Sequence, residues 1–140
     1  MSLERFVEAQ ERTYGAALAE LRSGHKRSHW MWFVFPQLAG LGRSATAQRY
    51  GLTDAEEARA YAAHPVLGTR LRECVHALLE LPGSDPVAVL GSVDALKLRS
   101  CLTLFAQVAP EEPVFAQVLD KYYDGRPDEL TLGILSSQQP

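Results

Sequence analysis

The chain is organised around residues 23–51, which read SGHKRSHWMWFVFPQLAGLGRSATAQRYG. This central segment contains both tryptophans, Pro36 and a Gly-x-Gly sequence. No aspartate or glutamate occurs from Leu21 to Thr53, whereas five lysine and arginine residues do. Because the whole chain carries a net charge of −3, the residues outside this stretch carry about −8. Aromatic rings beside unpaired positive charge are typical of a site for a planar anion, and equally of a core peptide with a basic rim.

The central segment also interrupts the helical pattern of the chain. The run HWMWFVFP at 29–36 is continuously apolar after its histidine, so its periodicity favours neither strand nor helix. Pro36 restricts Phe35 to an extended conformation, which predicts an ordered bend. Ser44 then follows GLG and can cap a short helix that ends at Gly51.

The remainder of the chain predicts capped amphipathic helices. The first spans about Leu3 to Arg22, with Ser2 as its cap and Gly24 as its end. Further helices are expected over about 53–64, 67–81, 86–91, 92–108, 113–124 and 128–135. We therefore expect an all-α fold: a compact single-domain bundle of six to eight helices over residues 1–140, with an irregular aromatic central segment and a loose tail at 136–140.

Composition limits the class of protein. A length of 140 residues with 46% hydrophobic and 22% charged residues suits one globular domain. The longest uncharged run, Ser28–Gly42, is too short and too mixed to span a bilayer, and the acidic N-terminus does not resemble a secretory signal. Cys74 and Cys101 each lie in an apolar helical pattern, as buried thiols in a reducing compartment do. We expect a cytoplasmic protein without a membrane partner.

The sequence lacks the motifs of the common enzyme classes. It has no P-loop, no His-Glu-x-x-His sequence and no Gly-x-Ser-x-Gly elbow, and two cysteines are too few for a zinc cage. We therefore predict no metal and no cofactor. With a pI near 5.8, the chain as a whole would repel nucleic acid phosphates, so no nucleic acid partner is expected.

Two groups of residues could carry chemistry. The first lies in the central segment: Lys26 and His29 as phosphate ligands or as catalytic acid and base, with Ser28, Trp30, Trp32 and Gln37 as ligand-binding residues. Arg43 and Ser44 extend this group, because a glycine-rich turn before a capped helix suits a phosphate. The alternative is that the tryptophans pack in the core and Lys26 is solvated.

The second group consists of Asp94 and Lys97, three residues apart at the start of the helix predicted from Ser92. An exposed ion pair across one helical turn explains them without a function. In a site, Asp94 would orient a ribose hydroxyl or serve as a general base, and Lys97 would bind a phosphate.

Taken together, these residues resemble the bacterial family of domain of unknown function 1810. The similarity covers nearly the whole chain and is carried by Phe6, Ala9-Gln10, Tyr14, GHKRSHWMWFVFPQL at 24–38, GLGRS at 40–44, Tyr61, His64-Pro65, Leu67-Gly68, Asp94, Lys97-Leu98, Thr103–Phe105, Leu119-Asp120 and Gly125. It implies a stand-alone all-α domain in the cytoplasm and brings no activity. The family is sometimes labelled calpastatin-like, but calpastatins are disordered inhibitors, whereas this chain predicts a folded domain.

A more distant similarity, in size and in aromatic and basic character, is to the NADAR group of small proteins, which act on N-glycosidic bonds of ADP-ribose-type molecules. It implies Lys26, Trp32, Asp94 and Lys97 as pocket residues. Two hypotheses follow. Either the chain binds an anionic small molecule of nucleotide or ADP-ribose type and cleaves an N-glycosidic bond with Asp94, or it is a non-catalytic interaction module whose aromatic segment is core or a peptide-binding face.

Overall fold

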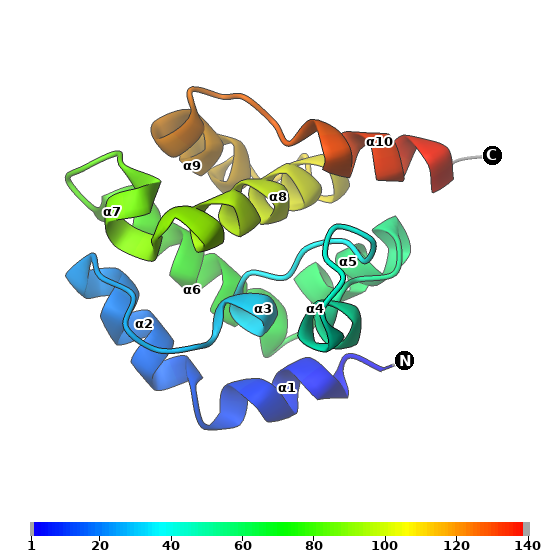
Figure 1. Ribbon diagram of the computed structural model, residues 1–140, viewed down its shortest axis with the longest axis horizontal. Coiled ribbons are helices and arrows are strands. Elements are labelled where there is room, and N and C mark those ends of the chain that lie inside the picture. Colours follow the sequence, from blue (N-terminus) through cyan, green and yellow to red (C-terminus); the bar gives the residue numbers. More distant parts are fainter. Residues whose placement is uncertain (1, 139–140) are drawn as a thin grey trace.

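The structure is a computed structural model that describes residues 2–138, and within them it contains ten α-helices and no strand (Figure 1). The helices are α1 (Glu4–Glu11), α2 (Tyr14–Ser23), α3 (Met31–Val34), α4 (Ala45–Tyr50), α5 (Ala55–Ala63), α6 (Leu67–Glu80), α7 (Pro86–Leu90), α8 (Ser92–Val108), α9 (Val114–Tyr123) and α10 (Glu129–Gln138). The predicted all-α fold is confirmed. No helix of the described part is both long and apolar enough to cross a membrane.

The number of helices exceeds the predicted six to eight at two places. The expected first helix is divided into α1 and α2, because Thr13 closes a tight turn: its backbone N–H donates to Gln10 O at 3.1 Å and its hydroxyl donates to Ala9 O at 2.7 Å. In addition, Met31–Val34 forms the single helical turn α3 immediately before the bend that Pro36 imposes.

Several helix ends follow the sequence prediction, and others shift. Gly24 ends α2 with a φ of 81° and donates to Glu20 O and Leu21 O, and the Ser44 hydroxyl accepts from Ala47 N at the start of α4. Leu3, without a side-chain cap, precedes α1 in place of the predicted Ser2. The cap of α5 is Asp54, one residue beyond the predicted Thr53.

The end of the chain also differs from the expectation of a loose tail. Helix α10 continues to Gln138, so residues 136–138 are helical, and residues 139–140 lie outside the described part. The Gln138 amide donates to Thr53 O at 2.9 Å, which ties the last turn of α10 to the segment before α5. This long-range contact is not visible in the polar sequence SSQ.

Helix α8 forms the centre of the molecule (Figure 1). It runs between α9 and α10 on one side and the layer of α1, α2 and α3 on the other, and it packs against α5, α7, α9 and α10. Nine of its residues are buried, with Leu98, Cys101 and Phe105 completely enclosed. Such burial makes α8 a rigid frame for the residues at its start.

Two buried polar side chains of α1 donate hydrogen bonds to backbone carbonyls of the central segment. Arg5, with 7% of its side chain exposed, donates to the carbonyls of Arg49 and Gly51 and pairs with Glu57 at 3.3 Å. Gln10 donates to Phe33 O at 2.7 Å, at the end of the segment that α3 occupies. Both residues therefore satisfy backbone groups of a stretch that forms little regular structure of its own.

A short backbone bridge closes the loop that follows Pro36. Leu38 and Leu52 form an isolated parallel bridge, in which Ala39 N donates to Leu52 O at 2.8 Å and Leu52 N donates to Gln37 O at 2.9 Å. The two ends of the Gly-x-Gly turn and of α4 are thereby brought together. The bridge holds the backbone of Gln37 in a fixed position relative to α8.

Candidate functional site

The loop before α3 is organised by one carboxylate, that of Glu20 in α2. Glu20 accepts from the backbone N–H of Arg27 at 2.7 Å and of Ser28 at 3.0 Å. It also accepts from the Ser28 hydroxyl at 2.6 Å and from the Trp30 indole N–H at 2.9 Å. Lys26 N donates to Val89 O at 2.8 Å and ties the same loop to α7. The Lys26 side chain is thereby fixed at the start of α8.

The Glu20 carboxylate is strongly stabilised in its ionised form. Partial burial by itself would raise its pKa, but the four hydrogen bonds that it accepts outweigh burial and lower the pKa from 4.5 to about 2. Sequence reasoning missed this residue, because Glu20 lies one position outside the acid-free stretch and reads as an ordinary surface glutamate of α2.

Lys26, Asp94 and Lys97 form a charge triad. Asp94 accepts from Lys26 Nζ through one carboxylate oxygen and from Lys97 Nζ through the other, each at 2.9 Å. The three side chains are between 10% and 16% exposed, so the triad is largely buried but open to solvent. The sequence analysis grouped Lys26, Asp94 and Lys97 as pocket residues. In the structure Lys26, from a segment almost seventy residues away, pairs directly with Asp94.

Each ammonium of the triad also lies over a tryptophan ring. Lys97 Nζ is 4.2 Å from the centroid of the Trp32 ring, and Lys26 Nζ is 5.1 Å from that of Trp30. These contacts hold both lysines in place without using their N–H donors in further hydrogen bonds. The tryptophans therefore serve as supports for the cations.

The charge state of the triad follows from these contacts. Desolvation by burial raises the pKa of Asp94, but the hydrogen bonds and charges of Lys26 and Lys97 outweigh it and hold the pKa below its ordinary value. Asp94 is thus ionised at neutral pH, and the triad carries a net charge of +1. An ionised carboxylate bonded through both oxygens is a weak proton acceptor, which argues against Asp94 as a general base.

Two cavities adjoin the triad. The first, of about 320 Å³, is lined by the residues Lys26, His29, Trp30, Trp32, Asp94 and Lys97, among others. The second, of about 370 Å³, lies between the Gly-x-Gly turn, α8 and the start of α10, and Gln37, Leu41, Leu96 and Leu130 line it. Trp32 and Lys97 line both cavities, so the two are neighbours across these side chains.

The remaining predicted site residues, which are Ser28, Trp30, Arg43 and Ser44, offer no free polar group to these two cavities. The Ser28 hydroxyl is bonded to Glu20, and Trp30 is 1% exposed, so it forms a wall of the first cavity with its indole N–H already used. Arg43 is exposed and lines neither cavity. Ser44 likewise lines neither, and its hydroxyl caps α4. Their assignment to ligand binding stays a prediction.

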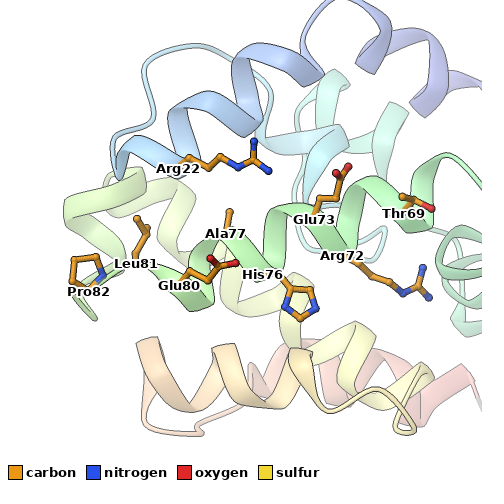
Figure 2. Close-up of a pocket in the computed structure, with 9 residues that line it drawn as sticks. All are labelled: Arg22, Thr69, Arg72, Glu73, His76, Ala77, Glu80, Leu81 and Pro82. Atoms are coloured by element: carbon orange, nitrogen blue, oxygen red, sulfur yellow. The ribbon is translucent and has the colours of Figure 1, made fainter.

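A larger cavity, of about 680 Å³, lies along α6 (Figure 2). Figure 2 shows its lining as side chains spaced along α6, with Arg22 contributed by α2. Its charged groups have both signs, and two of them are already engaged: Arg72 pairs with Glu112 at 2.5 Å, and Glu73 accepts from the Tyr14 hydroxyl at 2.6 Å. No residue of the predicted site lines it. Volume alone therefore does not make it the better candidate.

Comparison with known proteins places the chain in a family. Residues 1–135 match the family described as "Protein of unknown function (DUF1810)", and the chain belongs to this family. The resemblance stated from the sequence is thereby confirmed. No functionally curated protein matches the chain.

A solved structure supports the fold. The chain is similar to the conserved hypothetical protein Rv1873 from Mycobacterium tuberculosis, whose crystal structure is known at 1.38 Å. The two share 47% sequence identity and superpose with a TM-score of 0.94, and the match covers 96% of each chain. The helical architecture is thus shared over nearly the full length.

Proposed function

We propose that this protein binds an anionic small molecule, nucleotide-like or phosphorylated, in the cavity beside the Lys26–Asp94–Lys97 triad. The observation that carries the proposal is the convergence of two lysines, from the central segment and from α8, on one cavity of about 320 Å³. An ammonium has three N–H donors, and Asp94 takes one from each lysine. The others remain for a ligand.

The surroundings of the triad favour an anion. The exposed His29 borders the same cavity and adds donor capacity. The cavity has a net positive charge in a chain whose overall charge is −3, and the central segment contributes no acidic group. A phosphate would replace water around the two ammonium groups without leaving a buried charge unpaired.

Binding is supported better than catalysis. N-glycosidic hydrolysis would require a carboxylate to activate water or to steady positive charge on a ribose, and both oxygens of Asp94 are bonded to lysines. Hydrolysis would therefore begin only after a ligand anion draws the lysines away from Asp94. We also place the protein in the cytoplasm, since Cys74 and Cys101 are free and buried.

Calorimetric titration tests the proposal. The probes are inorganic phosphate, ribose 5-phosphate, AMP and ADP-ribose, each with the wild type, Lys26→Met and Arg27→Met. Arg27 is a matched control, because it is exposed and carries the same charge in the same loop, and it does not line the cavity. We expect at least one probe to bind, Lys26→Met to weaken it by about tenfold, and Arg27→Met to leave it unchanged. No binding of any probe, or equal weakening by both variants, would refute the proposal.

A further inference from the structure

We infer that the second cavity binds a planar heterocycle that is covalently attached to the anion bound at the triad. The Gln37 amide would recognise this heterocycle through hydrogen bonds. This inference rests on the proposed function and narrows the ligand to a nucleotide, as distinct from a bare phosphate or a sugar phosphate. Four observations support it: an amide without a protein partner, the engagement of Arg99, Ser100 and Asp128 within the protein, an apolar rim, and continuity with the first cavity.

The Gln37 amide has no protein partner in the described part of the chain, and its polar atoms reach solvent at the second cavity. Gln37 is 8% exposed and lines the second cavity, and among the described residues no hydrogen bond is formed by its side-chain oxygen or nitrogen. Its backbone carbonyl, in contrast, is fixed by Leu52 N at 2.9 Å. A primary amide that faces a cavity with both its donor and its acceptor free has the hydrogen-bonding capacity to pair with a complementary edge.

Three other polar side chains of the second cavity, those of Arg99, Ser100 and Asp128, form hydrogen bonds within the protein. Arg99 donates to the carbonyls of Arg126 and Pro127, at 2.8 and 2.9 Å. Asp128 accepts from Ser100 at 3.2 Å and caps the first turn of α10 by accepting from Thr131 N at 3.0 Å. Lys97 belongs to the triad. Gln37 therefore contributes a free amide, with both donor and acceptor, while Lys97 keeps its remaining donors for the anion.

The rim of the cavity is apolar where it meets solvent. Val93, Leu96 and Leu130 are 66%, 67% and 70% exposed, although such residues are usually buried. They come from α8 and from α10, so the two elements meet around one opening. A flat ring that entered this opening would cover apolar surface on its faces and present its polar edge to Gln37.

Continuity with the triad sets the class of ligand. Trp32 and Lys97 line both cavities, so a molecule with its phosphate at the lysines has its other end directed towards Gln37. An amide of this kind forms paired hydrogen bonds with the edge of a nucleobase. A sugar phosphate lacks such an edge and would leave the amide unpaired.

The test compares ribose 5-phosphate with the four nucleoside 5′-monophosphates by calorimetric titration. In the wild type, at least one nucleotide should bind about tenfold or more tightly than ribose 5-phosphate. Gln37→Leu should abolish that difference, leave the affinity for ribose 5-phosphate unchanged, and not lower the melting temperature of the free protein, because no protein hydrogen bond is lost. Gln107→Leu, an exposed glutamine elsewhere on α8, serves as the control and should change nothing.

A second variant tests the inference even if the Gln37→Leu protein does not fold. Leu96→Ser changes a side chain that is already 67% exposed, and it should weaken nucleotide binding while sparing ribose 5-phosphate. If ribose 5-phosphate binds in a Lys26-dependent manner as tightly as every nucleotide, this inference is wrong and the proposed function stands. If no probe binds at all, both fail.

Discussion

The substitution Glu20→Gln tests the account of the loop before α3. The carboxylate of Glu20 accepts four hydrogen bonds, from two backbone amides, one hydroxyl and one indole. Glutamine has one acceptor oxygen, and its NH₂ group would face donors that it cannot satisfy. The substitution keeps the shape of the side chain, removes its charge and replaces one acceptor oxygen by a donor, so it weakens the charge-assisted hydrogen bonds of the loop.

The magnitude follows from the pKa of Glu20, which lies at about 2 in place of 4.5. A shift of this size corresponds to about 3 kcal/mol. Because the side chain is only half-buried, solvent screening reduces the expected loss of unfolding free energy to about 1–2 kcal/mol. Since the folded-state pKa is the lower one, this contribution is present above pH 4.5 and is lost as the pH falls towards 2.

Urea denaturation followed by circular dichroism measures the effect at neutral pH and at a series of lower values. The difference in unfolding free energy between wild type and Glu20→Gln should be about 1–2 kcal/mol at pH 7 and should shrink below pH 4.5. Glu8→Gln, an exposed glutamate of α1, is the control and should have little effect. A difference that is absent at pH 7, or that does not change with pH, would refute the reasoning.

Other predictions concern the stability of the core and of the segments around the site. Arg5→Met leaves the Arg49 and Gly51 carbonyls unpaired and should lower the unfolding free energy, measured by urea titration, by about 2–4 kcal/mol. An unchanged unfolding free energy would contradict the role of Arg5 in supporting these carbonyls. Gly68→Ala places a Cβ 2.2 Å from Ala62 O and should lower the melting temperature, while Gly133→Ala, with open space around it, should not. Burial raises the pKa of the Cys74 thiol to about 12, so a thiol reagent should label neither cysteine until the protein is denatured; labelling of the native protein would contradict this.

The sequence predicted those features that depend on neighbours along the chain. Gly24 ends α2 and Ser44 caps the start of α4, as their residue types suggest. The apolar faces of the predicted helices form the core. The break at Thr13 was not predicted, because the apolar spacing continues across it. The capping of α5 by Asp54 in place of Thr53 is a shift of one residue between two good N-cap types, which local pattern does not resolve.

The sequence prediction placed the central segment and the Asp94–Lys97 turn around one pocket, but it did not predict the ion pair between Lys26 and Asp94. Lys26, Asp94 and Lys97 were identified by charge and by exception to the helical pattern, but no spacing rule places Lys26 beside Asp94. Glu20 was missed for the same reason, since its partners lie across a loop. The available signal was the charge balance of Leu21–Thr53, where five cations occur without an acid. Of these five, Lys26 is the one that is not exposed, and it takes its partner from α8.

The position of Asp94 and Lys97 at the start of α8 has a practical consequence for ligand screening. The same helix continues into the core through Leu98, Cys101 and Phe105, which couples its first turn to the packed part of the domain. Binding energy gained at the triad is therefore transmitted to global unfolding. At a ligand concentration of a hundred times its dissociation constant, the gain is about 2.7 kcal/mol, and a shift in melting temperature becomes a faithful report of occupancy.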